Sequence, residues 1–394
     1  MDRVARENSF QRERFRAAGA VLPESWEAFS RTVPFTTKQE LLADQSAHPP
    51  DGTNLTADRG RYIRFCQTSG TTGASLRVWD TAQSWGWLLD NWERGYAWAG
   101  VRPGATVYFA FSFGPFLGFW TAFESAARCG MRVIPGGGLG TRARLHAIWE
   151  HRAEVLCCTP TYALHLAEVA HAESLDPLSS PVRKILVAGE PGGSIPAVRQ
   201  HLERAWPQAE ILDHYGMTET GPVAFAVQGK NSGLRVLEDR YYAEVVSPDS
   251  LKPVAEGALG ELILTPLGRA DWPLLRYRTG DLVRARRDAE GALWLEGGIL
   301  GRADDMRVVR GVNVYPSAVD ALVRSVAGVG EYRVMLSTRG AMTELQLEVE
   351  ADRSAARELE HLFEKALSLR IPVRTVAEGT LPRFEMKARR WVEC

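Results

Sequence analysis

The sequence predicts an α/β protein with a large N-terminal domain of parallel-rich sheets, a β-rich subdomain, and a small α+β C-terminal domain. Three observations support this prediction. Short apolar runs alternate with longer helix-like stretches between residues 106 and 212, as in parallel strands joined by crossover helices. Turn signals multiply between residues 234 and 294. About ninety residues follow Gly301-Arg302, enough for a small domain, so we expect domains at 1–301 and 302–394.

The expected elements run in this order along the chain. Residues 1–60 are expected to be largely helical, because Thr37 and Glu40 have the spacing of a capping box ahead of Leu41-Leu42. The strands expected next are 106–111, 131–135, 155–158, 184–188 and 210–212. The helices expected between them are 116–128, 142–150, 162–171 and 195–206. The C-terminal expectations are strands at 306–309, 332–336 and 344–349, and helices from Pro316 and over 355–369.

Composition narrows the range of partners. The 394-residue chain is 45% hydrophobic, which is sufficient for a substantial core. Its 47 basic and 48 acidic side chains give no general attraction to nucleic acid or to an anionic membrane. The five cysteines include Cys157-Cys158 and show neither metal-ligand spacing nor a disulfide framework. With a charged N-terminus and no apolar run of membrane-spanning length, the sequence indicates a cytoplasmic protein.

A Gly/Ser/Thr-rich run, Thr68-Ser69-Gly70-Thr71-Thr72-Gly73-Ala74-Ser75, lies between two apolar segments. Glycines allow backbone N–H groups to converge on a phosphate, and the hydroxyls add further donors. Taken alone, such a run is more often a polar surface turn. It lacks the Gly-Lys-Ser/Thr ending of a Walker loop, so P-loop ATPase chemistry is not indicated.

Four further motifs change that interpretation. They are Asp213-His214-Tyr215-Gly216-Met217-Thr218-Glu219, Tyr277-Arg278-Thr279-Gly280-Asp281-Leu282, Gly301-Arg302-Ala303-Asp304-Asp305-Met306, and Leu381-Pro382-Arg383-Phe384-Glu385-Met386-Lys387. In this order and spacing the set resembles the adenylate-forming superfamily of acyl-CoA synthetases, adenylation domains and luciferases. Residues 304–316 together with Thr159-Pro160-Thr161-Tyr162 most resemble its phenylacetate-CoA ligase branch.

The resemblance implies ATP, Mg²⁺ and coenzyme A as cofactors, and it suggests a role for each motif. Thr68, Ser69, Gly70, Thr71, Thr72 and Gly73 would cradle the ATP phosphates, Thr218 would contact the α-phosphate, and Glu219 would help to hold Mg²⁺. Tyr215 would stack on adenine within the segment Asp213-His214-Tyr215-Gly216, with Gly189, Glu190 and Pro191 on the other side. Asp281 would bind the ribose hydroxyls, and Arg302 would reach ribose and phosphate. Without these motifs, Glu219 would be interpreted as a surface residue and Asp281 as a turn residue.

The C-terminal motifs imply a mobile domain. Lys387 matches the lysine that stabilises charge in the adenylation step, although Lys387-Ala388-Arg389-Arg390 alone would be interpreted as a solvated basic end. Asp304 matches the hinge about which this domain turns between the two half-reactions. Gly311 matches a position where a pantetheine arm passes close to the backbone.

An aromatic cluster is the candidate acyl pocket. Phe111, Phe113, Phe116, Phe119 and Trp120 surround two glycines and precede Gly136-Gly137-Gly138. Such residues belong to a core as often as to a ligand site. In the resembling branch this segment holds the acyl group. A small aryl or cyclic carboxylic acid is therefore the expected substrate.

Three departures from the family pattern accompany the match: Ala74-Ser75 after the phosphate loop, Met386 beside Lys387, and a shorter chain. The first hypothesis is an aryl acid ligase that forms an acyl-adenylate and transfers the acyl group to coenzyme A. A second delivers the acyl group to a carrier-protein thiol or to an amine. A third, a nucleotide-binding regulator without catalysis, is disfavoured by Glu219, Arg302 and Lys387.

Overall fold

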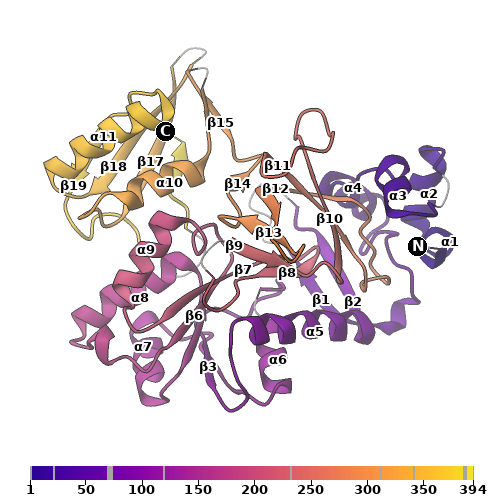
Figure 1. Cartoon of the computed structure of the whole chain (residues 1–394), viewed down its shortest axis with the longest axis horizontal. Helices are drawn as coiled ribbons and strands as arrows, with labels where there is room; N and C mark the ends of the chain where they lie inside the picture. Colours follow the sequence, from indigo (N-terminus) through magenta and orange to yellow (C-terminus); the bar gives the residue numbers. More distant parts are fainter. Residues whose placement is uncertain are drawn as a thin grey trace.

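The computed structural model describes the backbone of residues 2–20, 23–68, 74–118, 120–230, 233–310, 312–339, 342–384 and 388–393. It confirms the mixed α/β class, with a twelve-stranded sheet and a separate four-stranded sheet (Figure 1). Several expected site residues lie outside the described residues: Ser69–Gly73, Phe119, Gly311 and Lys387.

The N-terminal segment is helical, as expected, as far as Ala47. Its helices are α1 (Asp2–Glu7), α2 (Ser9–Ala17), α3 (Trp26–Thr32) and α4 (Lys38–Ala47). The capping box of α4 is confirmed, because Thr37 Oγ1 accepts the Glu40 N–H while Glu40 Oε2 accepts the Thr37 N–H at 2.7 Å. Phe29 and Val33 pack with Leu275, so these helices lie against the antiparallel end of the large sheet (Figure 1).

A short hairpin leads into the main sheet. Strands β1 (Tyr62–Gln67) and β2 (Arg77–Thr81) pair antiparallel, and they flank the Gly/Ser/Thr-rich run as the sequence predicts. Helix α5 (Ala82–Trp98) follows β2 directly.

The predicted parallel half of the large sheet is confirmed. Its strands are β3 (Thr106–Phe109), β4 (Arg132–Pro135), β5 (Val155–Cys158), β6 (Lys184–Val187) and β7 (Glu210–Met217), in the order β4-β3-β5-β6-β7. The connecting helices are α6 (Trp120–Arg128), α7 (Thr141–Glu150), α8 (Pro160–Ala172) and α9 (Pro196–Ala205). Side chains alternate between two cores: Val107 and Phe109 join one, while Tyr108 joins the other. Pro160 at the first turn of α8, after the Thr159 cap, shows why that helix begins where β5 ends.

The strand expected at 210–212 is longer than predicted and includes His214 and Tyr215. Strand β7 continues to Met217, so both residues lie within it. Parallel pairing with β6 ends at Asp213, and β8 (Gly221–Phe225) then pairs antiparallel with the rest of β7. The apolar run at 210–212 therefore marks only the part of the strand that is covered on both faces.

The β-rich segment is confirmed, but it is continuous with the same sheet. Its strands are β9 (Gly233–Val236), β10 (Tyr241–Val246), β11 (Leu259–Pro266), β12 (Tyr277–Arg287) and β13 (Leu293–Glu296), with β14 (Gly301–Arg302) beside β12. At eight and eleven residues, β11 and β12 are longer than the four-residue strands β3 to β6. Turn residues mark where these strands begin and end, but they do not make the strands short.

The C-terminal part has its own sheet and core. A hairpin of β15 (Arg307–Val309) and β16 (Val312–Val314) precedes α10 (Pro316–Ser325). The sheet has the order β19 (Val373–Val376), β18 (Met342–Glu350), β17 (Tyr332–Arg339) and β20 (Trp391–Glu393), with α11 (Arg353–Leu367) packed on it through Leu359 and Phe363. This part lies over α8 and α9 of the larger part (Figure 1).

No helix among the residues that the structure describes is both long enough and apolar enough to cross a membrane.

Candidate active site

A chain of buried polar contacts joins three of the expected nucleotide residues. The Tyr215 hydroxyl donates to Asp281 Oδ2 at 2.6 Å, and Arg302 donates to Asp281 Oδ1 at 3.1 Å. Arg302 also forms a two-point ion pair with Asp304, at 2.8 and 3.0 Å. The structure therefore brings the candidate adenine, ribose and hinge residues into one network, built from β7, β12, β14 and the segment after β14.

The carboxylate at the centre of this network has an unusual pKa. Burial raises the pKa of Asp281 to about 6, while the neighbouring Arg302 guanidinium opposes the shift. Burial, together with the Asp281 charge, raises the pKa of Tyr215 well above its usual value. Around neutral pH the pair is therefore an ionised carboxylate accepting a hydrogen bond from a neutral phenol.

A second group surrounds Glu219. Its Oε1 accepts a hydrogen bond from the Tyr277 hydroxyl at 3.3 Å, and Lys38 Nζ lies 3.4 Å from the same oxygen. Buried Arg269 donates to the carbonyls of Thr218 and Glu219 at 3.0 and 2.7 Å, and it also pairs with Asp80. The Thr218-Glu219 turn is thus held through its backbone carbonyls, while the Glu219 side chain meets Tyr277 and Lys38 through one oxygen.

The Glu219 site fits a magnesium ion. Among the described residues, no group of three or more His, Cys, Asp or Glu side chains is placed to hold a metal unaided. Mg²⁺ is usually bound through one or two carboxylates together with substrate phosphates, rather than by a full protein cage. A single buried carboxylate in the Thr218-Glu219 turn matches that donor set.

The structure describes the base of the Gly/Ser/Thr-rich loop. The Thr68 N–H donates to the Leu76 carbonyl at 3.0 Å, and Leu76 N–H donates to Thr68 Oγ1 at 3.0 Å. These two bonds close the ends of the run. The Thr68 hydroxyl oxygen thus helps to hold the loop, and the phosphate role of residues 68–73 stays a prediction.

Asp213, His214 and Gly216 are placed differently from Tyr215. The His214 ring packs 4.3 Å from Trp92 and 4.5 Å from Phe225, and its Nδ1 bonds the Ala224 carbonyl at 3.1 Å. Burial lowers the pKa of His214 to about 3, so it stays neutral. Burial raises the pKa of Asp213 to about 6, against hydrogen bonds from Ser194 and His214. Asp213 and His214 thus make internal contacts, while Gly216 is exposed on the strand.

The segment after β6 shows an arrangement that was not expected. Gly189 and Pro191 are exposed, as a ligand surface requires. Glu190 instead accepts a hydrogen bond from the Thr161 N–H at 2.7 Å and another from the Ala388 N–H at 3.1 Å. Its carboxylate therefore joins α8 to the segment that precedes β20.

The predicted aromatic cluster is only partly assembled. Phe113 lies 5.1 Å from Phe111 and 4.6 Å from Trp120, between ring centroids. Phe123 lies 5.3 Å from Phe113 and was not expected. Phe116 packs instead against Gly114 and Gly118.

Two glycines line the same region. A Cβ on Gly137 would lie 3.3 Å from the Phe113 ring, and one on Gly136 would lie 2.8 Å from the Phe109 carbonyl oxygen. The glycines therefore allow the loop after β4 to approach the rings, as the sequence suggested.

Several contributors were missed by sequence reasoning. Lys38 follows the Thr37 cap, and nothing in its local sequence connects it with Glu219. Arg269 and Asp80 lie in segments without a recognisable motif, and Phe123 could have been found from its spacing of three residues after Trp120, which places both on one helix face.

Comparison with known proteins now identifies the family. Residues 12–266 match the family model of the AMP-binding enzyme, and residues 311–393 match that of the AMP-binding enzyme C-terminal domain. The chain belongs to the AMP-binding enzyme family. Residues 267–310 fall in neither match, so the domain boundary at 301/302 stays a prediction.

Relatives refine the assignment. The chain is 33% identical to the phenylacetate-coenzyme A ligase of Thermus thermophilus over 83% of this chain and 73% of that protein. It is 31% identical to the phenylacetate-coenzyme A ligase of Escherichia coli over 96% of this chain and 88% of that protein. The expected resemblance to this branch is confirmed, and so is the cofactor set, because adenylate-forming CoA ligases use ATP, Mg²⁺ and coenzyme A.

A solved relative also indicates a conformational state. 2-Hydroxyisobutyryl-CoA ligase in its postadenylation state, with 2-HIB-AMP, matches with a TM-score of 0.93 at 29% identity over 100% of this chain and 87% of that one. The same enzyme in its thioesterification state, with 2-HIB-AMP and CoA, gives 0.75 at 30% identity and equal coverage. The present arrangement therefore matches the postadenylation state.

Proposed function

We propose that this protein activates a small aromatic carboxylic acid as its acyl-adenylate and then transfers the acyl group to coenzyme A. In the first step a carboxylate oxygen bonds to the α-phosphorus of ATP, the bond to the β-phosphate oxygen breaks, and pyrophosphate leaves. In the second step the thiol sulfur bonds to the acyl carbon, AMP leaves, and the thiol proton is released.

The observation that carries the aromatic assignment is the Phe111, Phe113 and Trp120 cluster facing the Gly136-Gly137 loop. Ring edges and faces favour a planar apolar ligand through offset or edge-on contacts. Gly137 lets the loop after β4 approach the Phe113 ring, and the packed rings restrict the depth available to a long chain. The phenylacetate-coenzyme A ligases among the relatives agree with a substrate of this class.

The polar network supports a role for each nucleotide-binding residue. Asp281 and Arg302 would bind the ribose, with Tyr215 positioning Asp281 and presenting its ring to adenine. Thr218 and Glu219, held by Arg269, would contact the α-phosphate and hold Mg²⁺, which supplies positive charge to the polyphosphate when bound. Lys387 would stabilise charge as the adenylate forms, and Asp304 would serve as the hinge.

Two alternatives concern the substrate and the acceptor. The similarity to 2-hydroxyisobutyryl-CoA ligase favours a small branched hydroxy acid as the second substrate class. A carrier-protein thiol is the alternative acceptor. It is favoured by 26% identity to the medium/long-chain-fatty-acid–[acyl-carrier-protein] ligase FadD10 of Mycobacterium tuberculosis, over 80% of this chain and 63% of that protein.

Pyrophosphate exchange with a panel of acids tests the substrate assignment. We expect exchange with benzoate- and phenylacetate-like acids and much less with C12–C16 fatty acids. Preference for 2-hydroxyisobutyrate or a fatty acid would refute the aromatic pocket. Formation of free acyl-CoA by the purified protein would separate coenzyme A from a carrier protein as the acceptor.

The variant Phe113→Ala tests the pocket directly. Loss of one apolar contact should raise the KM for the acid about tenfold to a hundredfold, with little change in the KM for ATP. Trp26→Ala is the control, since it also removes an aromatic ring, one that stacks on Tyr242 in the N-terminal helical segment and is partly exposed. An unchanged KM for the acid in Phe113→Ala would show that the ring belongs to the core alone.

A further inference from the structure

Side-chain hydrogen bonds cross from the larger part of the molecule to the C-terminal part, here residue 307 onward. Among the residues described they include Glu190 with the Ala388 N–H at 3.1 Å, Glu168 with Arg383 at 3.2 Å, Thr161 with Arg390 at 3.5 Å, and the Leu300 carbonyl with Ser317. Of these, the Glu190 contact involves a carboxylate whose two oxygens each accept a hydrogen bond from a backbone N–H group. It also reaches the residue that directly follows Lys387 in the sequence.

The first oxygen of Glu190 is fixed by helix α8. Thr161 is the second residue of α8, and its N–H belongs to the first turn, whose N–H groups have no partner within the helix. Glu190 Oε1 accepts this hydrogen at 2.7 Å, and the positive end of the helix dipole favours the carboxylate there. The side chain is therefore oriented before the C-terminal part makes any contact.

The second oxygen holds a segment that is firmly attached to the C-terminal sheet. Ala388 lies just before β20, which pairs in parallel with β17 from Trp391 onward. The Val334 N–H of β17 donates to the Arg390 carbonyl at 2.7 Å, and Arg390 forms an ion pair with Glu331 at 2.6 Å. A hydrogen bond from the Ala388 N–H therefore restrains the position of the C-terminal sheet as well as that of its own segment.

We propose that Glu190 is a positioning residue that holds the C-terminal domain in the orientation in which the adenylate forms. This inference rests on the proposed function and replaces adenine contact as the main task of the Glu190 carboxylate. Glu190 acts through its hydrogen bonds with Thr161 and Ala388, and it does not contact the reacting atoms.

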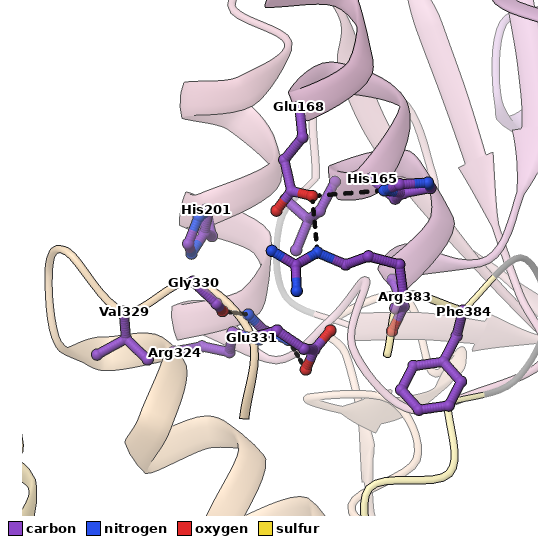
Figure 2. Close-up of a pocket in the computed structure, with 11 residues that line it drawn as sticks. His165, Glu168, His201, Arg324, Val329, Gly330, Glu331, Arg383 and Phe384 are labelled. Carbon is purple, nitrogen blue, oxygen red and sulfur yellow. Dashed lines mark hydrogen bonds and ion pairs between the residues drawn. The ribbon is translucent and has the colours of Figure 1, made fainter. Parts of the chain in front are cut away.

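The nearby contact between Arg383 and Glu168 (Figure 2) differs from the Glu190 contact in the partners that its groups have. Arg383 bonds Glu168 of the larger part, but it also forms an ion pair with Glu350 of its own domain at 2.8 Å. Glu168 is 49% exposed, and exposed ion pairs contribute little. When the domain turns away, Arg383 keeps its Glu350 partner, whereas the Ala388 N–H loses the carboxylate. The Glu190 contact therefore discriminates between the orientations more sharply than the Glu168 contact does.

The variant Glu190→Gln tests the inference because it keeps the shape while replacing one acceptor oxygen by a donor that faces an N–H. We expect kcat for pyrophosphate exchange to fall by about tenfold, as expected for loss of a hydrogen bond to a charged group, with the KM for ATP unchanged. Thioester formation from supplied acyl-adenylate should not slow. Glu190→Ala should give the same pattern.

Two control variants sharpen the result. Glu173→Gln removes a carboxylate that pairs with Arg142 and His146 inside the larger part, so both half-reactions should keep their rates. Glu168→Gln should lower the exchange rate less than Glu190→Gln. An increased KM for ATP with unchanged kcat in Glu190→Gln would assign Glu190 to adenine contact instead, and equal slowing of both half-reactions would assign it a purely structural role.

Hydrogen exchange provides a readout that does not depend on the acid substrate. In full-length Glu190→Gln, peptides that contain residues 388–393 should exchange faster than in the wild type, while peptides from β18 should not change. Unchanged exchange at 388–393 would overturn the inference. Absence of pyrophosphate exchange in the wild type with every acid would instead refute the proposed function and leave this measurement valid.

Discussion

The candidate nucleotide site and the C-terminal domain are stabilised in different ways. Around the nucleotide site, charged groups are buried and paired, as in Arg269 with Asp80, whose side chains are 0% and 1% exposed. Breaking such a pair leaves an uncompensated buried charge, which is strongly destabilising. The C-terminal domain has a core of its own, and the hydrogen bonds described between it and the larger part are few and partly exposed.

This difference indicates which parts of the molecule can move. A domain with its own core and a polar interface can change orientation without unfolding. The hydrogen bonds that join Tyr215, Asp281 and Arg302 favour one geometry, because the buried Tyr215 and Asp281 side chains would otherwise lose partners. The TM-scores of 0.93 and 0.75 to two states of one relative agree with a rigid larger part and a second part that differs in position.

The largest effect is expected from the C-terminal domain. We predict that Lys387→Ala lowers the rate of adenylate formation by about 10²–10³, since removal of one donor that stabilises developing charge typically has this effect. Thioester formation from supplied acyl-adenylate should stay largely intact. Single-turnover assays of each half-reaction measure the two rates, and an equal loss in both would contradict the assignment of Lys387 to the first step.

The next effect concerns the hinge. We predict that Asp304→Pro slows thioester formation about tenfold or more, and adenylation much less, because proline fixes φ and restricts backbone rotation between β14 and β15. Asp304→Ala separates the backbone from the ion pair with Arg302, and it should affect thioester formation less than the proline variant. Equal turnover of folded Asp304→Pro and wild type would argue against rotation at this residue.

The fold was predictable because its signals are local. Alternating apolar runs marked β3, β5 and β6 to within one or two residues, and the capping box marked α4. The end of β7 was misjudged because Asp213, His214 and Gly216 are not typical strand residues. Their place in the strand comes from pairing with β8, a tertiary contact that intrinsic propensity does not reflect.

The candidate site was predictable only in part, for a related reason. The family resemblance gave Tyr215, Asp281 and Arg302, from three separate motifs, neighbouring roles, and the structure joins them. Lys38 and Phe123 carry no motif. The Glu190 contact with Ala388 spans 198 positions and depends on how the C-terminal part is placed against the larger part. Sequence patterns that describe one segment at a time do not contain such information.

The smallest expected effect is a pH dependence of the KM for ATP, which tests the candidate nucleotide site. Burial raises the pKa of Asp281 to about 6 from its ordinary value of 3.8, so the carboxylate becomes protonated as pH falls through that range. A protonated carboxyl offers fewer acceptors to the ribose hydroxyls, so the KM for ATP should rise by up to about tenfold one pH unit below the pKa. Asp213 titrates in the same range, again with a pKa of about 6.

Two variants separate these carboxylates. Asp281→Asn should have a higher KM for ATP at neutral pH and should lose the added rise below pH 6, because position 281 then has no proton to gain. Asp213→Asn should keep that rise, since Asp213 contacts Ser194 and His214 and is not proposed to meet the ribose. If the KM for ATP rises equally in wild type and Asp281→Asn as pH falls, the titrating group lies elsewhere and Asp281 is not the ribose ligand. If the rise is lost in Asp281→Asn alone, the buried network is the part of the molecule that sets nucleotide affinity.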